Sequence, residues 1–525
     1  MKPGLTPLSS FAETFFMKSY IGLTIFSGFM LIETAFALER TADDVVRAKI
    51  CAAVVAGPIE FGQVQPNEAS IKAIKCPEWF RDAKFGIWSH WGPGCISGVD
   101  QNYAREMYRV GTWAYKYHVE HFGDPTKVGY KDILKYWTAA NWDPDGLMKK
   151  YKAAGAGYFV SMGRHHDGVD CYDSQYTPWN SAKVGPKKDV GGLWQQAAIK
   201  QGLRFGFSFH PHDFYYWEGQ NQNQPKVVFD TSDPKYWSLY VPPRGTPGAD
   251  VEFKDGVYAR IKDAVDKYHP DLLYFDGGIP DPNERGYKLM AHFYNSNIKR
   301  NDGTNEAVLC LKSDQGGVKD LERAEMKTIT ENPWQTDTSE SGWFYLDEPA
   351  AADELYTFHR SSTTMLHMLI DIVSKNGNLL MNIPQRADGT IDEHCENLVA
   401  DFAAWMKINR EAIFETRPWV IYGEGPSQLP RSNLNDLKSP LTSKDFRFTT
   451  RGHTLYAIMC GWPANGKAVI QSLGNDSKYA AGEIKELRLL GCQQKLEWTR
   501  TSEDLKVNLP TQKPCDLAYV FKISF

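Results

Sequence analysis

The feature of this sequence that most restricts its fold is a regular alternation of short apolar runs and amphipathic stretches between about residues 76 and 415. The apolar runs have the length and the residue content of buried strands: Phe85–Trp88, Tyr158–Met162, Arg204–Phe209, Leu272–Phe275, Val308–Leu311 and Leu379–Ile383. Helical periodicity marks the stretches Pro144–Ala154, Leu193–Gln201, Val257–Lys267, Tyr356–Ser374 and Glu393–Arg410. Such an alternation predicts a parallel sheet, either open or closed into a barrel.

A different pattern begins after Arg417-Pro418-Trp419, where short alternating runs are separated by Gly, Pro, Asn and Asp. This pattern is typical of antiparallel strands, expected at Phe446–Thr449, Thr454–Met459, Ala468–Ser472, Ile484–Leu490, Leu505–Leu509 and Ala518–Ile523. Gly423–Lys444 is expected to be a surface loop. We therefore predict a leader over residues 1–37, an N-terminal arm over 38–75, a β/α barrel over 76–415 and a small antiparallel β-sandwich over 416–525.

The start of the chain is typical of an export signal. An apolar run, Tyr20–Ile32, follows Met17 and leads to Ala35-Phe36-Ala37, which has the small residues of a cleavage site. Since residues 1–16 fit no signal pattern, translation from Met17 is a hypothesis. The run is shorter than the roughly 20 residues of a membrane span, and a buried apolar helix is the alternative. We expect a mature protein without a membrane span, exported to a periplasmic, extracellular or lysosome-like compartment.

Composition excludes several classes of protein. With 42% apolar and 23% charged residues the chain is not mainly disordered, and its net charge of −5 argues against a broad basic surface for nucleic acid. Nine cysteines without a Cys-x-x-Cys pair argue against a structural zinc site. The 16 Trp, 26 Tyr and 27 Phe residues suit large cores and sugar-binding clefts equally well.

Polar residues follow four of the predicted strands at the point where each strand ends. The strands lead into Ser89-His90-Trp91-Gly92, Gly163-Arg164-His165-His166-Asp167-Gly168, His210-Pro211 and Asp276-Gly277-Gly278. In a β/α barrel the carboxyl ends of all strands meet on one face, where the active site is built. The sequence therefore predicts a (β/α)8-like barrel with a site made of His and Asp side chains.

These side chains allow more than one chemistry. His165-His166-Asp167 contains possible metal ligands, although adjacent residues on a strand point to opposite faces. Neutral imidazoles that hydrogen-bond sugar hydroxyls would fit equally well. Asp276 ends an apolar strand before two glycines that allow close ligand approach, and such a carboxylate can attack an anomeric carbon. A turn-forming Asp-Gly is the alternative.

Taken together, the motifs resemble glycoside hydrolase family 29, the α-L-fucosidases. The matching segments occur in the family's order over about residues 76–420: Trp79–Ile87, His90–Pro93, His165–Gly168, Trp179–Ser181, Gly185–Asp189, the Asp276 strand, Pro333–Thr338 and Asn376–Pro384. The resemblance implies a retaining hydrolase that acts on fucosylated oligosaccharides or glycoconjugates and needs no cofactor or metal. It implies that Asp276 is the nucleophile, that His90, His165 and His166 hold the fucose hydroxyls, and that Trp91 and Trp334 line the pocket. His210 matches another pocket position more loosely.

The acid/base residue departs from the family pattern. Many relatives carry a Glu directly after the Trp of a Pro-Trp-Glu motif, where this chain has Gln335, which cannot donate a proton as an acid. Other relatives place a Glu about 45 residues after the nucleophile, and here that residue is Glu322. We expect Glu322 to be the acid/base, with Glu325, Glu331, Asp337 and Glu340 in reserve. A second departure is Gln101-Asn102, where relatives carry an acidic residue and a Trp.

Two other functions remain open from the sequence. Because of Gln335, the chain could be a noncatalytic fucose- or carbohydrate-binding protein. Because of the histidine pair, it could be a metal-dependent hydrolase.

Overall fold

The computed structural model describes residues 41–211, 228–242, 246–347, 359–427, 440–479 and 482–525. The predicted leader, including Met17 and the cleavage site at Ala37, lies outside the described residues. Within the described ranges, no helix combines the length and the apolar character that crossing a bilayer requires. All nine cysteines are described, and each of them is unpaired.

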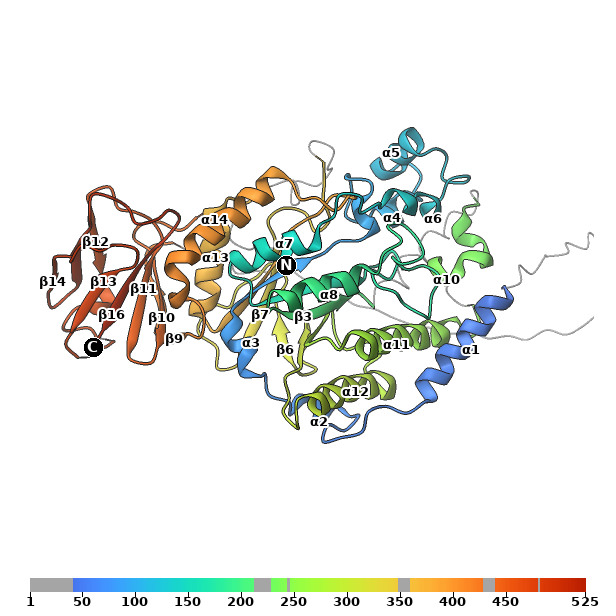
Figure 1. Cartoon of the computed structure of the whole chain (residues 1–525), viewed down its shortest axis with the longest axis horizontal. Helices are drawn as coiled ribbons and strands as arrows, with labels where there is room; N and C mark the ends of the chain where they lie inside the picture. The colour runs from blue at the N-terminus through green and yellow to red at the C-terminus, as the bar shows by residue number, and fades with distance from the viewer. Residues whose placement is uncertain (1–40, 212–227, 243–245, 348–358, 428–439, 480–481) are drawn as a thin grey trace, which may run out of the picture. The chain divides into compact units, whose positions relative to one another are not determined.

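Eight of the described strands close into a parallel barrel in the order β1-β2-β3-β4-β5-β6-β7-β8. Strands β3, β6 and β7 of this barrel are labelled in Figure 1. Their bounds are β1 Phe85–Ser89, β2 Tyr158–Arg164, β3 Arg204–Phe209, β4 Leu272–Phe275, β5 Val308–Leu311, β6 Val318–Asp320, β7 Trp334–Ser339 and β8 Gly377–Asn382. The barrel closes where Phe85 of β1 pairs with Leu379 of β8. The open-sheet alternative is therefore wrong, and the barrel is confirmed.

Two barrel strands, β6 and β7, were not predicted from the sequence. All six residues of β7 are buried although most of them are polar. Inside the barrel, Gln335 accepts a hydrogen bond from the Tyr158 hydroxyl at 2.7 Å and donates one to Asp320 at 2.8 Å. Buried polar groups are stable only when they are paired in this way, so β7 lacks the apolar pattern by which the other strands are recognised.

Helices surround the barrel. The longer ones are α5 Trp113–His121, α7 Pro144–Ala153, α8 Val190–Lys200, α11 Ala249–Tyr268, α12 Glu284–Arg300, α13 Ser362–Ser374 and α14 Glu393–Asn409. Short helices and turns are α3 Glu78–Ala83, α4 Tyr103–Glu106, α6 Tyr130–Ile133, α10 Trp237–Tyr240, η1 Pro93–Cys95, η2 Leu134–Tyr136, η4 Asp230–Ser232, η5 Pro234–Tyr236 and η6 Arg410–Ala412. Of the helix predicted over Tyr356–Ser374, residues 356–358 lie outside the described residues. Helix α13 begins at Ser362, where the Ser361 hydroxyl accepts from the main-chain nitrogen of Thr364 and caps it.

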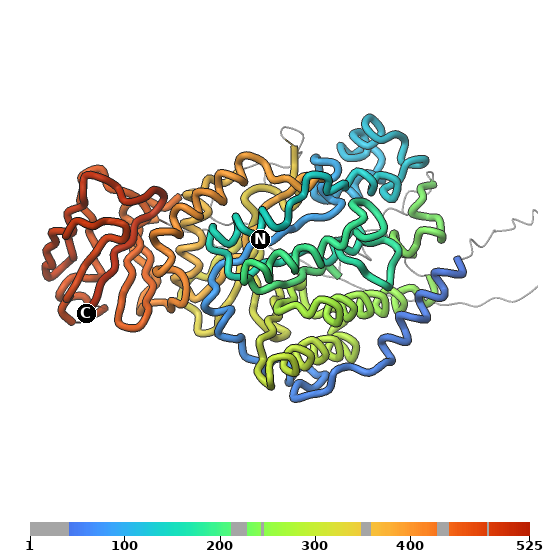
Figure 2. Tube along the Cα trace, in the orientation of Figure 1, coloured from blue at the N-terminus to red at the C-terminus, as the bar shows by residue number. Residues whose placement is uncertain are grey.

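The arm before the barrel contains α1 Ala42–Ala56 and α2 Glu68–Lys72. Figure 2 shows α1 beside α11, and α11 beside α12. Lys288 of α12 donates to the carbonyl oxygen of Gly57 at 2.9 Å, and His292 accepts from the main-chain nitrogen of Glu60 at 2.9 Å. The arm is thus attached to the barrel's own helices.

The last part of the chain forms two antiparallel sheets with a shared apolar core. One sheet has the order β13-β16-β11-β10-β9 and the other β12-β15-β14. Their bounds are β9 Arg417–Glu424, β10 Phe446–Arg451, β11 Thr454–Met459, β12 Lys467–Ile470, β13 Glu486–Leu489, β14 Trp498–Arg500, β15 Leu505–Asn508 and β16 Tyr519–Ser524, with the turn η7 Gln471–Leu473 after β12. The predicted sandwich is confirmed, with β9 and β14 added to the expected strands.

A buried cluster of charges joins the barrel to the sandwich. Asp371 of α13 forms ion pairs with Arg447 of β10 and with Lys375, and Lys375 lies 3.7 Å from Glu325. These four side chains are at most 4% exposed. Desolvation of buried charges is costly unless each one is paired, so the fit between the two parts depends on every member of this cluster.

Candidate active site

A cavity of about 160 Å³ opens at the carboxyl ends of the barrel strands. It is lined by Trp88, His90, Gln101, Asn102, His165, His166, His210, Asp276, Lys312, Glu322, Asp337, Trp343 and Phe344. The structure thus brings together Asp276, Glu322 and all four predicted histidines. These residues follow strands β1, β2, β3, β4 and β6, as expected for a barrel rim.

Lys312, which follows β5, lies between the two carboxylates. Its Nζ is 2.5 Å from Asp276 Oδ1 and 2.6 Å from Glu322 Oε2, and 3.9 Å from Asp337 Oδ2. Sequence reasoning missed this residue, although the signal was the same as for Asp276: a charged residue directly after an apolar run. A single ammonium group therefore fixes the relative position of both carboxylates.

The two carboxylates have pKa values that move in opposite directions. Burial, and next the Asp337 carboxylate, raise the pKa of Glu322. Burial would also raise the pKa of Asp276, but His210 and Lys312 outweigh it and hold that pKa below its usual range. Burial lowers the pKa of His210 to about 3, so His210 is neutral at neutral pH and Lys312 supplies the positive charge beside Asp276.

The main chain around Glu322 is fixed by strand β7. The nitrogen of Leu321 donates to the Gln335 carbonyl at 2.9 Å, and that of Arg323 to the Asp337 carbonyl at 3.0 Å. The buried Arg323 guanidinium stacks on Trp343, with 4.8 Å to the ring centroid. Glu322 is therefore held by its two neighbours and is not an isolated charge on a solvated helix.

The pocket histidines form one compact group. Ring centroids are 4.8 Å apart for His90 and His165 and 4.6 Å apart for His165 and His210. Burial lowers the pKa values of His90 and His165 well below the ordinary range. Within the described residues, Nδ1 of His90 and Nδ1 of His210 have no hydrogen-bond partner. Neutral imidazoles with such nitrogens can donate to or accept from hydroxyl groups of a ligand.

The expectation that His165 and His166 point to opposite faces is wrong. Strand β2 ends at Arg164, so the two residues lie beyond the regular strand, and both line the cavity with ring centroids 4.5 Å apart. Nitrogen atoms of His90, His165 and His210 also lie within 4.8 Å of one another, a spacing that a metal ion can use.

The two predicted pocket tryptophans lie elsewhere. Trp91 packs against Trp137 and Trp142 and donates to the Arg386 carbonyl at 2.9 Å. Trp334 begins β7, at the end of the strand away from the cavity, and donates to the Lys375 carbonyl at 3.0 Å. Both indoles are 1% exposed, and each N–H has a partner in the protein.

Other aromatic rings form the walls, and the sequence did not single them out. Trp88 of β1 donates to Ser208 at 3.0 Å, and Trp343 and Phe344 reach the cavity from the loop after β7. The Gln101 side chain accepts from the main-chain nitrogen of Phe344 at 2.8 Å. Gln101, the residue that departs from the family pattern, thus holds an aromatic wall in place.

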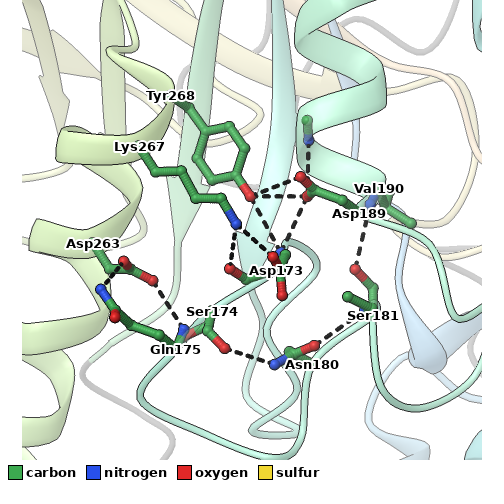
Figure 3. Close-up of polar contacts among 12 residues, drawn as sticks. Asp173, Ser174, Gln175, Asn180, Ser181, Asp189, Val190, Asp263, Lys267 and Tyr268 are labelled. Atoms are coloured by element: carbon green, nitrogen blue, oxygen red, sulfur yellow. Dashed lines mark hydrogen bonds and ion pairs between the residues drawn. The ribbon is translucent and has the colours of Figure 1, made fainter.

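The loop after β2 carries His165 and His166 and is attached firmly to α11 (Figure 3). Tyr268 donates to both oxygens of Asp189, Lys267 contacts Asp173 at 2.6 Å, and Asn180 donates to the Ser174 carbonyl at 2.8 Å. Asn180 and Asp189 belong to the motifs Trp179–Ser181 and Gly185–Asp189. These motifs support the loop and lie outside the lining of the cavity.

The reserve acids are distributed around the barrel. Glu325 belongs to the junction cluster, Glu331 is exposed, and Glu340 contacts His359. Asp337 lines the cavity but is 1% exposed and accepts from the Tyr274 hydroxyl at 3.1 Å. Gln335 lies inside the barrel and outside the cavity lining, so the absence of a carboxyl group at this position does not change the cavity.

Both the sequence and the fold are similar to those of known proteins. The family model described as Alpha-L-fucosidase matches residues 53–411, and the Alpha-L-fucosidase C-terminal domain matches residues 439–524. Relatives include the tissue alpha-L-fucosidase of Bos taurus, 26% identical over 87% of this chain and 89% of the relative, and the plasma alpha-L-fucosidase of Homo sapiens, 26% identical over 87% and 92%. The Thermotoga maritima alpha-fucosidase solved in complex with fucose has a TM-score of 0.66 and 23% identity, covering 87% of this chain and 99% of that one. This likeness confirms the fold.

Proposed function

Because the chain belongs to the alpha-L-fucosidase family, whose model matches residues 53–411, we propose that it is an exported, retaining α-L-fucosidase. It would remove terminal α-L-fucose from glycans or glycoconjugates. The observation that carries the proposal is the pair Asp276 and Glu322, bridged by Lys312, with pKa values that move apart. Export rests on the leader-like residues 17–37.

The reaction would proceed in two displacements. Ionised Asp276 attacks the anomeric carbon, and protonated Glu322 gives its proton to the departing glycosidic oxygen as the C–O bond breaks. Glu322 then removes a proton from water, which attacks the same carbon, and the Asp276 ester bond breaks to release L-fucose. Both carboxylates contact one Nζ, which suits the separation of about 5–5.5 Å in retaining enzymes.

The substrate's hydroxyls would be held by the neutral histidines. An uncharged imidazole donates from one nitrogen and accepts at the other, which suits vicinal hydroxyl groups. The rings of Trp88, Trp343 and Phe344 would cover the apolar face of the sugar. Gln335 gives no support to a noncatalytic protein, because this side chain lies inside the barrel, paired with Tyr158 and Asp320.

Replacing Glu322 with alanine tests the proposal. We expect kcat to fall by at least about 10²-fold on fucosides with poor leaving groups. With aryl fucosides, whose leaving groups need little protonation, the rate of the first displacement should fall much less. Azide should then accelerate turnover and give α-L-fucosyl azide, since it attacks the Asp276 ester without needing a general base. NMR of the first product measures the configuration.

The exposed Glu331 provides the control, because Glu331→Ala should retain wild-type kcat. β-L-fucose as the first product of the wild type would show inversion and overturn the mechanism. Full activity of Glu322→Ala without any azide effect would transfer the acid role to another residue, with Asp337 the next to test.

Replacing Lys312 with methionine is expected to change the pH dependence of kcat/KM. Without the ammonium group, burial raises the pKa of Asp276, so activity should be lost at a higher pH as the solution is acidified. Removal of a neighbouring charge commonly shifts a pKa by about 1–3 units. Lys319→Met removes an exposed lysine of β6 and should leave the acidic side of the kcat/KM–pH profile unchanged. If the acidic side of the profile is unchanged in Lys312→Met, Lys312 does not lower the pKa of Asp276.

A further inference from the structure

A second group of potential ligands lies at the same end of β7, outside the cavity lining. Glu340 follows β7, His359 precedes α13, and His394 lies in the first turn of α14. One ligand atom of each residue lies within 4.8 Å of the others. Glu340 and His359 are 19 positions apart in the sequence, and His394 is farther still from His359, so this group forms no short sequence motif.

One carboxylate oxygen faces both imidazoles. Glu340 Oε2 is 2.9 Å from His359 Nδ1 and 3.4 Å from His394 Nε2. In a tetrahedral zinc site with bonds of about 2.0–2.1 Å, neighbouring ligand atoms are about 3.3 Å apart. The two oxygen–nitrogen separations are therefore close to those of a His2Glu set, and all three ligand atoms lie within 4.8 Å of one another.

The other carboxylate oxygen is already occupied. Glu340 Oε1 accepts from the Ser341 hydroxyl at 2.7 Å and from the Cys395 thiol at 3.4 Å. Ligating carboxylates are commonly oriented by such outer hydrogen bonds. His394 Nε2 is also 3.0 Å from the Arg360 carbonyl oxygen, so metal binding requires this nitrogen to lose its proton.

The buried negative charge of Glu340 favours the binding of a cation at this cluster. Its side chain is 1% exposed, and within the described residues its ion-pair partners are His359 and His394. A buried carboxylate is costly unless a cation compensates it. A divalent ion would do so with both imidazoles neutral.

We propose that Glu340, His359 and His394 bind one divalent transition-metal ion, for which zinc is the probe. Imidazole and carboxylate ligands suit this class of ion. The ion would join three segments: the loop after β7, the start of α13 and the start of α14. The first of these carries Trp343 and Phe344, so the ion would fasten a wall of the cavity while taking no part in the reaction.

The test uses the full chain, first stripped with a chelator and then titrated with Zn²⁺ against a chromophoric competitor. We expect one zinc per chain, a higher thermal midpoint with zinc than without it, and at least about ten-fold weaker binding in His394→Ala. Glu340→Gln keeps the size of the side chain and should weaken binding similarly, so the test does not depend on one variant folding. His453→Ala, at an exposed histidine of the sandwich, is the matched control and should bind zinc as the wild type does.

An excess of L-fucose separates this site from the pocket histidines. Zinc that remains bound in the presence of fucose, and that is lost in both variants, supports the proposal. The absence of zinc binding, binding unchanged by either variant, or zinc displaced by fucose would overturn it.

Discussion

Asp276→Ala is expected to lower kcat/KM on an aryl α-L-fucoside by at least about 10⁴-fold, as the loss of a covalent nucleophile commonly does. Among the described residues, the other carboxylates of the cavity lining are Glu322, the proposed acid/base, and Asp337, which is buried and bonded to Tyr274. Lys312 keeps Glu322 as a partner in the variant, so we expect the fold to remain. Steady-state kinetics and a thermal unfolding curve, measured on the same preparation, test both statements.

The configuration of the product formed with azide provides a second test of the nucleophile assignment. In Asp276→Ala the space left by the carboxylate admits azide, which would attack the anomeric carbon directly and give β-L-fucosyl azide. Glu322→Ala should give the α anomer, so the two variants distinguish the two roles by configuration alone. Asp314→Ala, at an exposed residue near Lys319, should behave as wild type. Near-normal turnover in Asp276→Ala would refute the nucleophile assignment.

The second large effect concerns stability. Asp371→Ala should lower the free energy of unfolding by about 3–5 kcal/mol, because it leaves Arg447 and Lys375 as buried charges without their carboxylate. The midpoint of urea unfolding, followed by tryptophan fluorescence, measures this loss.

A more exposed ion pair that also joins barrel and sandwich provides the comparison. Glu411 contacts Lys522 at 2.6 Å, with both side chains about one third exposed. Pairs accessible to solvent contribute about 0–1 kcal/mol, so Glu411→Ala should change the midpoint little. Equal losses in the two variants would show that burial of the Asp371 cluster does not determine its energy.

The sequence predicted the barrel because six of its strands are apolar enough to be recognised. Leu272–Phe275 and Val308–Leu311 occur with the bounds expected from their residues. Strands β6 and β7 could not be recognised, since β6 is three residues long and β7 places polar groups inside the barrel. Their stability depends on partners such as Tyr158, which is far away in the sequence.

The site was predictable where the chemistry and the strand end coincide. Asp276, His90, His165, His166 and His210 all reach the cavity, as does Glu322. The tryptophans were misplaced because an indole next to a rim motif can turn either way. Its direction is decided by an acceptor for the N–H, which for Trp91 is a main-chain carbonyl almost 300 residues away.

The polar interior of the barrel has a consequence for how such an enzyme can change over evolution. After burial, Asp337 is the neighbour that most raises the pKa of Glu322. Burial and next Asp337 also raise the pKa of Asp320, which accepts a hydrogen bond from Gln335. Substitutions at Asp320 or Gln335, which lie outside the cavity lining, would change the electrostatic surroundings of Glu322, the proposed acid. Lineages in compartments of different acidity would then be able to change their working pH through residues inside the barrel, with the cavity lining itself unchanged.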